Sequence, residues 1–229
     1  MLPIGDDNGQ GGPLPLANWA FIALNLLAFM VELAQPSGAL QSFITAWGVV
    51  PREYATFHDI APLIPLPFWV TLVTSMFLHG GWAHILGNML YLWIFGDNLE
   101  RAMGRGRYVV FYLLCGLAAG LAHIAFNSTS RVPSVGASGA ISGVLGGYIL
   151  LFPRNRVRVM MRGGITAVPA WVMLGLWILI QLVSGFGSVA STEQTAGVAY
   201  MAHIGGFAAG LLLVKLFVAG RGRTSPAYV

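Results

Sequence analysis

The sequence predicts an all-α, polytopic membrane protein: a bundle of six transmembrane helices with a long first loop that is partly embedded in the membrane. Of its 229 residues, 56% are hydrophobic and only 9% are charged, which is too little polar surface to cover a water-soluble globule. Apolar stretches of the length that a bilayer requires recur along the chain. The arginines stand between these stretches, as is typical of cytoplasmic loops, which are rich in Lys and Arg.

Six apolar stretches are expected to form the spanning helices. They are residues 16–33, 82–95, 108–126, 138–152, 168–186 and 198–218. The second and fourth are short for a full span, so we expect their ends to lie below the membrane surface. Residues 61–78 are also apolar, but Pro62, Pro65 and Pro67 interrupt their first half as a helix. This segment could be an interfacial loop or a seventh span. A seventh span would break the asymmetry of Lys and Arg between the two sides of the membrane, so we assign the segment to the long first loop.

One domain is expected over residues 16–220, with a flexible tail at 1–15 and a short cytoplasmic tail at 221–229. With six spans and a cytoplasmic N-terminus, ten of the twelve Lys and Arg side chains fall on the cytoplasmic side. Only Arg52 and Arg131 fall on the outer side. The net charge of +4 is therefore interpreted as a topology signal. No nucleic-acid partner is expected.

Few polar side chains interrupt the predicted spans, and each needs a partner or a function because burial in lipid is costly. His84 and Asn88 stand four residues apart on one helical face. Ser138 opens the fourth span within VGASGAISG, and His203 lies in the sixth within AYMAHIGGFAAG. A structural interpretation is open for each: Ser138 as a helix cap and His203 as a hydrogen-bonded packing residue.

Small residues on the fourth and sixth spans indicate how these two helices could meet. They form one stripe at Gly139, Gly143 and Gly147 and another at Ala202, Gly206 and Gly210, with Gly136 just ahead of the fourth span. Such stripes let helix backbones approach closely. If the two stripes face each other, a hydrogen bond between Ser138 and His203 becomes possible, which is the minimal requirement for nucleophilic catalysis by serine.

The remaining polar residues point to no other chemistry. No HExxH motif occurs, and His79, His84 and His203 lack helical spacing, so no metal is expected. The other polar residues of the spans are interpreted as packing or interface groups. The packing residues are His123, Gln181 and Asn25, and the interface residues near span ends are Glu32 and Asp97.

Taken together, these segments resemble the rhomboid family of intramembrane serine proteases over about residues 17–220. FLHGGWAHILGNMLYLWIFGDNLE is similar to the family's HxxxxHxxxN second helix, GASG to its nucleophile motif and AHIGG to its base-bearing sixth helix. The resemblance implies a dyad of Ser138 as nucleophile and His203 as general base. No Asp or Glu occurs in the fourth or sixth span to complete a triad. The implied oxyanion donors are His84, Asn88 and the backbone N–H of Ser138.

The resemblance also implies a structural role for His79 and a water-filled cavity open to the outer side. It further implies a mobile fifth helix or cap loop, and the polar run 188–194 is a candidate for the cap. The chain departs from the pattern at two places. Ser142 stands where some members carry an aromatic residue against the base, so the orientation of His203 is left open. Trp69 is followed by Val70, where some members have a Trp-Arg pair.

The sequence therefore predicts a serine endopeptidase, a hydrolase that cleaves transmembrane segments of membrane proteins near the outer membrane face. We expect a multi-pass protein of the bacterial inner (plasma) membrane with both termini cytoplasmic. Its expected partners are transmembrane protein substrates and the lipid bilayer, and no cofactor is expected. Two alternatives stay open: a catalytically silent rhomboid-like protein that binds membrane clients, and a small transporter or channel whose polar residues line a pore.

Overall fold

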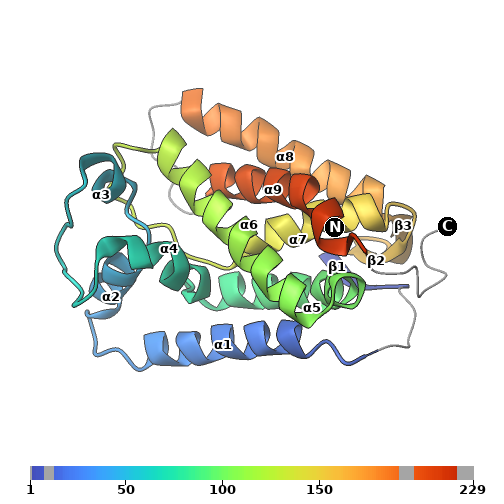
Figure 1. The fold of residues 1–229 in the computed structure, drawn as a ribbon, viewed down its shortest axis with the longest axis horizontal. Coiled ribbons are helices and arrows are strands. Elements are labelled where there is room, and N and C mark those ends of the chain that lie inside the picture. The colour runs from blue at the N-terminus through green and yellow to red at the C-terminus, as the bar shows by residue number, and fades with distance from the viewer. Residues whose placement is uncertain (1, 8–12, 191–198, 221–229) are drawn as a thin grey trace.

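A bundle of helices with a small sheet at one end forms the structure (Figure 1). The computed structural model describes residues 2–7, 13–190 and 199–220, with the backbone alone for 188–190. The long helices are α1 (Leu16–Leu33), α5 (Trp82–Met103), α6 (Arg105–Phe126), α7 (Ser138–Leu151), α8 (Ala170–Ala190) and α9 (Tyr200–Val218). The shorter elements are β1 (Leu2–Asp6), α2 (Leu40–Trp47), α3 (Pro51–Thr56), the 3-10 helices η1 (Phe68–Val70) and η2 (Ser75–Phe77), α4 (Thr71–Thr74), β2 (Arg156–Met161) and β3 (Gly164–Pro169).

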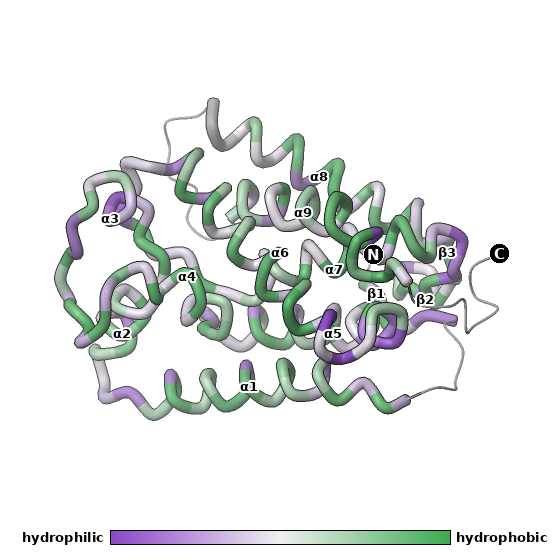
Figure 2. Tube along the Cα trace, in the orientation of Figure 1, coloured by the Kyte–Doolittle hydropathy of each residue, from purple (hydrophilic) through white to green (hydrophobic). Residues whose placement is uncertain are grey.

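Four of the described helices are long and apolar enough to cross a membrane: α1, α6, α8 up to residue 187, and α9. Figure 2 shows hydrophobic residues along α1, α6 and α8, and hydrophilic residues near the sheet. The predicted count of six spans remains a prediction. The expectation of a short second helix is wrong, because α5 has 22 residues. The helix continues past its apolar part through a polar turn in which Asp97 and Arg101 form an ion pair of 3.0 Å.

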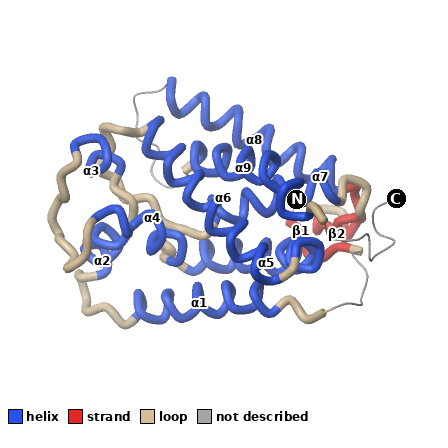
Figure 3. Tube along the Cα trace, viewed as in Figure 1, coloured by secondary structure: helices blue, strands red, loops and turns tan. Residues whose placement is uncertain are grey.

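Short helices joined by loops make up the segment between α1 and α5 (Figure 3). Its apolar run Phe68–Phe77 has fewer residues than a bilayer requires. The run is also divided among η1, α4 and η2. Leu63 is 67% exposed and Trp69 is 59% exposed. Exposed apolar side chains of this kind favour contact with lipid, and the partial embedding of this loop remains a prediction.

The contact between α7 and α9 lies at the centre of the bundle. Residues 139–148 of α7 are all buried. A Cβ on Gly206 would collide with the carbonyl of Gly139, and a Cβ on Gly210 would collide with the carbonyl of Gly143. The two glycine stripes therefore face each other, and the helix backbones touch because no side chain separates them.

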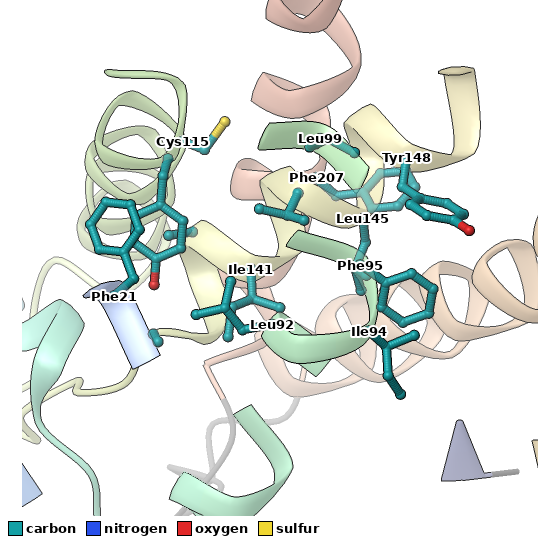
Figure 4. Packing of buried hydrophobic residues seen from close by; sticks show 14 of the residues in the cluster. Phe21, Leu92, Ile94, Phe95, Leu99, Cys115, Ile141, Leu145, Tyr148 and Phe207 are labelled. Carbon is teal, nitrogen blue, oxygen red and sulfur yellow. The ribbon is translucent and has the colours of Figure 1, made fainter. Parts of the chain in front are cut away.

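Aromatic and aliphatic side chains from several helices fill the space around this contact (Figure 4). The ring of Phe95 meets Tyr148 edge to face, with ring centroids 4.9 Å apart. Phe21 of α1 stacks on Tyr112 of α6 at 4.0 Å. Lipid tails are as apolar as these side chains, so close-fitting packing, rather than transfer from water, holds the helices together.

The sheet has β2 at its centre, paired antiparallel with β1 and β3. Val157 and Val159 are fully buried and belong to the hydrophobic core, whereas Arg156 and Arg158 are exposed. Successive side chains of a strand point to opposite faces, which explains the alternation. The sheet covers one end of the bundle, next to the C-terminal end of α7.

Strand β1 differs from the predicted flexible tail over residues 1–15. The carboxylate of Asp6 accepts hydrogen bonds from the hydroxyl of Tyr148 at 2.6 Å and from the side-chain amide of Asn98 at 2.9 Å. These bonds fix the strand to α7 and α5. Its five residues are too few to show strand periodicity in the sequence. The predicted cytoplasmic tail, 221–229, lies outside the described residues.

Candidate active site

Ser138 and His203 meet at the N-terminal end of α7, away from the sheet that follows the C-terminal end of this helix. Ser138 is the first residue of α7, and His203 is the fourth residue of α9. Oγ of Ser138 lies 2.8 Å from Nε2 of His203, although 65 residues separate them in sequence. The backbone contact between Gly139 and Gly206 brings the two helix ends together. This geometry is the one that activation of a serine hydroxyl by an imidazole requires.

The second ring nitrogen of His203 also has a partner. Nδ1 lies 2.7 Å from Oε1 of Gln181 on α8. An amide oxygen can only accept a hydrogen bond, so Nδ1 carries the ring proton and Nε2 accepts from Ser138. On sequence alone Gln181 is interpreted as a hydrogen-bonded packing residue, and the structure shows which group it meets: its side chain contacts the imidazole of His203 directly. One amide in an otherwise apolar helix was the only signal that could have found it.

The face of the imidazole is covered by α8 rather than by α7. Oγ of Ser142 donates to the carbonyl oxygen of Ser138 at 2.6 Å, so this hydroxyl is directed to its own helix. The ring of Trp177 lies against His203 with centroids 5.9 Å apart and planes tilted by 36°. The orientation of His203, which the sequence leaves open, therefore depends on Trp177 and Gln181.

His84 and Asn88 of α5 present two hydrogen-bond donors beside the loop that precedes α7. Nδ1 of His84 accepts from the backbone N–H of Gly80 at 3.3 Å, so the ring proton is on Nε2. The side-chain nitrogen of Asn88 is buried and has no hydrogen-bond partner among the described residues. A Cβ on Gly136 would lie 2.7 Å from Nε2 of His84 and 3.6 Å from Nδ2 of Asn88. Both donors therefore lie beside Gly136, which precedes Ser138 by two residues in the sequence.

Only glycine suits position 136. Its φ of +127° lies in a region that L side chains rarely adopt, and a side chain there would also meet the ring of His84. The backbone N–H of Gly136 donates to the carbonyl of Ser75 at 2.8 Å, which fixes the loop. At the start of α7 the first backbone N–H groups have no acceptor within the helix. The start of α7 therefore offers backbone donors two residues after Gly136, the position beside which His84 and Asn88 lie.

A buried carboxylate holds the turn in front of α5. Glu32 at the end of α1 is only 2% exposed, and its two oxygens lie 2.9 and 3.2 Å from the backbone nitrogen of His79. The rings of His79 and His84 are 5.0 Å apart. Burial and the neighbouring His84 lower the pKa of His79 to about 4. The interpretation of Glu32 as a solvated interface group is wrong, because it anchors the segment that carries His84.

A second carboxylate joins three helices at the sheet end. Glu100 is 3% exposed and accepts hydrogen bonds from the backbone N–H groups of Ala17 and Asn18 at 3.1 and 2.7 Å. An anion at these first residues of α1 is favoured by the helix dipole. The hydroxyl of Tyr108 donates to the side-chain oxygen of Asn18 at 2.8 Å. This network fixes α1, α5 and α6 relative to one another.

A small, partly open cavity lies beside Ser138. Small and polar side chains form much of its lining, among them Ser75, Ala119, His123, Ser134 and Ala202. His123, interpreted on sequence as a packing residue, therefore reaches this cavity. Within the described part of the chain, no group of three His, Cys, Asp or Glu residues could hold a metal ion. The predicted cap, 188–194, lies outside the described residues except for the backbone of 188–190.

Comparisons with known proteins agree with this arrangement. A family model described as "Rhomboid domain" matches residues 67–220, a range that includes Ser138, His203, His84 and Asn88. The chain is 31% identical over 196 residues to Rhomboid protease GluP of Bacillus subtilis, covering 86% of this chain and 34% of that protein.

Two eukaryotic relatives match over shorter ranges. RHOMBOID-like protein 5 of Arabidopsis thaliana is 31% identical over 160 residues, or 69% of this chain and 48% of that protein. The mitochondrial Rhomboid protein 1 of Saccharomyces cerevisiae is 29% identical over 147 residues, or 62% and 40%. The chain thus spans about a third to a half of the length of these relatives. Because the family model covers more than half of it, the chain belongs to the rhomboid family, whose domain is a polytopic helical fold of the membrane.

Proposed function

We propose that this chain is a serine endopeptidase that hydrolyses peptide bonds in or near transmembrane segments of other membrane proteins. The observation that carries the proposal is the 2.8 Å contact between Oγ of Ser138 and Nε2 of His203. It lies within a bundle whose outer surface is apolar, as intramembrane chemistry requires. The name of one relative, Rhomboid protease GluP, supports the same class of activity.

In the proposed reaction, Ser138 is the nucleophile and His203 is the general base. Nε2 takes the hydroxyl proton while Oγ bonds to the carbonyl carbon of the substrate, and the π electron pair moves to the carbonyl oxygen. The imidazolium then gives its proton to the leaving nitrogen, and the C–N bond breaks. A water molecule repeats both steps on the acyl-enzyme, which releases the carboxylic acid and restores Ser138.

The negative oxygen of the tetrahedral intermediate needs donors that are already in place. We assign this role to the backbone N–H of Ser138, Nε2–H of His84 and Nδ2–H of Asn88. The position of both side-chain donors beside Gly136 supports the assignment. The positive end of the α7 dipole adds to the stabilisation.

The proposed site faces the outer side of the membrane, with both chain ends in the cytoplasm. The support is the distribution of charge. Cytoplasmic loops are rich in basic residues. Many such residues lie near the sheet, at the opposite end of α7 from Ser138. They include Arg101, Arg105, Arg107, Arg154, Arg156, Arg158, Arg162 and Lys215. The corresponding location in a bacterium is the inner (plasma) membrane.

Substrates are proposed to be transmembrane helices that unwind near the cut. The backbone groups of an intact helix are bonded to each other, so an unwound segment is needed before Ser138 can reach a carbonyl carbon. Ala119 and Ala202 line the cavity beside the nucleophile, which favours small substrate side chains at that place.

The test compares wild type with Ser138→Ala and His203→Ala, each purified and reconstituted in lipid vesicles with a single-span substrate. Matched controls are Ser130→Ala and His58→Ala, which make the same changes in two loops. Cleavage is followed on a gel. We expect wild type and both controls to cut, and both dyad variants to lose cleavage.

Each other outcome rejects part of the proposal. Equal cleavage by Ser138→Ala and wild type would show that the mechanism is wrong. Binding of the substrate by wild type without cleavage would favour a client-binding protein. Flux of ions or small solutes that survives Ser138→Ala would favour a transporter or channel.

A further inference from the structure

Gln181 is a buried amide in the middle of an apolar helix. It is 8% exposed, and its neighbours along α8 are mostly large hydrophobic residues. A polar side chain in a membrane helix is costly unless it is paired, so its partner indicates its role. That partner is not a neighbouring turn of α8 but the imidazole of His203, with 2.7 Å between Oε1 and Nδ1.

The position of Gln181 on α8 directs it to the base. Trp177, Gln181 and Gly185 recur at intervals of four residues and share one helical face. The ring of Trp177 lies against His203. At Gly185 the helix approaches α9 closely, because an added Cβ would lie 3.0 Å from Ile204. This face of α8 therefore packs on the part of α9 that carries the base.

The contact determines which nitrogen of His203 can act. An imidazole that has lost its partner at Nδ1 can carry its proton on either nitrogen and can rotate about its side-chain bonds. With Oε1 of Gln181 accepting from Nδ1–H, the lone pair is on Nε2, which lies 2.8 Å from Oγ of Ser138. After proton transfer, the same oxygen accepts from an imidazolium, and such a charge-assisted hydrogen bond is stronger.

We propose that Gln181 is the positioning residue of the catalytic base, so that the site is a row of Ser138, His203 and Gln181 rather than an isolated dyad. The inference rests on the proposed function and deepens it. A neutral amide is sufficient for this task, as the Cys-His-Asn arrangement of papain-like proteases illustrates. Because Gln181 stands on α8 while the dyad stands on α7 and α9, the base is held in place only when α8 is packed against α9.

The experiment replaces Gln181 by Leu, Glu and Asn in the full chain. Leu has a similar size and no acceptor, Glu has the same length and an oxygen in either protonation state, and Asn is one methylene too short. The matched control is Gln35→Leu, because the side-chain amide of Gln35, two residues past the end of α1, donates to the carbonyl of Val31 in that helix. Cleavage of a single-span substrate gives kcat and KM, and thermal unfolding in detergent reports on the fold.

For Gln181→Leu and Gln181→Asn we expect kcat to fall about tenfold to a hundredfold, the loss that one hydrogen bond to a charged group explains, with KM unchanged. Gln181→Glu keeps most of the activity, and Gln35→Leu resembles wild type. Wild-type kcat in Gln181→Leu would overturn the proposal. So would a loss of kcat in all three variants that follows their unfolding temperatures, since that indicates a merely structural role.

A second measurement is independent of proteolysis. The ring-nitrogen NMR signals of His203, assigned by their absence in His203→Ala, report which nitrogen is protonated. We expect protonation at Nδ1 in wild type and Gln181→Glu, and a mixture of both forms in Gln181→Leu. An unchanged spectrum in Gln181→Leu would refute the positioning role. Failure of the proposed function is recognised separately, because Ser138→Ala would then cut like wild type whatever the spectrum shows.

Discussion

The carboxylate of Glu32 accepts a hydrogen bond from the backbone N–H of His79, which is 47 residues away in the sequence. The oxygen–nitrogen distances are 2.9 and 3.2 Å. This bond joins the end of α1 to the turn in front of α5, and both residues are buried. A buried N–H group without an acceptor is costly. The stability of the fold and the placement of His84 therefore depend on the same carboxylate.

Replacing Glu32 by Ala leaves the N–H of His79 unpaired. We expect the free energy of unfolding to fall by about 1–3 kcal/mol, with a loss of cleavage because His84 follows the same turn. Glu32→Gln keeps one oxygen acceptor and is expected to lose less. Unfolding in detergent and the vesicle cleavage assay measure the two effects. An unfolding free energy unchanged in Glu32→Ala would contradict this account.

The contact between α7 and α9 predicts the effect of added methyl groups. Gly206→Ala and Gly210→Ala place a Cβ against a carbonyl of α7, so the helices must separate. Such overpacking typically costs about 1–3 kcal/mol, and it also lengthens the distance between Ser138 and His203. Gly175→Ala on α8 is the control, since its added Cβ meets nothing within 4 Å. Unfolding and cleavage of Gly206→Ala that match those of Gly175→Ala would show that the close approach is not required.

The outcome at particular residues shows what the sequence could predict. Ser138 and His203 stand in short motifs flanked by glycines, because close helix contact restricts the residue types on both sides. Gln181 and Glu32 have no such motif. Their partners come from packing between helices distant in sequence, and a single amide or carboxylate in an apolar run does not reveal which helix it will meet. Strand β1 was not predicted for the same reason, since Asp6 is fixed by side chains from two other elements.

The proposed oxyanion donors predict a loss of rate without a loss of stability. Nδ2 of Asn88 has no protein partner within the described residues, so Asn88→Ala removes a donor for the intermediate without breaking a hydrogen bond of that nitrogen. We expect kcat to fall about 10²- to 10³-fold, the usual cost of removing one such donor. The unfolding temperature should change little. Asn127→Ala, which removes an amide that follows the last residue of α6 and donates to the carbonyl of His123, is the matched control. A wild-type kcat in Asn88→Ala would remove Asn88 from the site.

Glu53 in the first loop predicts a dependence of stability on pH. Burial raises its pKa from 4.5 to about 7, the neighbouring Asp59 acts in the same direction, and the hydrogen bond from the backbone N–H of Ile60 opposes them. Between these two pKa values the folded chain keeps a proton that the unfolded chain has lost. The contribution of this group to stability is therefore fully present below about pH 4.5 and is lost as the pH rises to about 7.

The comparison of wild type with Glu53→Gln isolates this group, because glutamine resembles the protonated acid at every pH. At pH 4.5 the two proteins should unfold at similar temperatures. As the pH rises to 8, wild type should become progressively less stable than Glu53→Gln, since only wild type must then bury a charged carboxylate. His79 has a lowered pKa and acts in the opposite direction, but it is present in both proteins and cancels from the difference. A gap between the two unfolding temperatures that does not change with pH would show that Glu53 is ionised in the fold, and burial would then not be the dominant influence on this side chain.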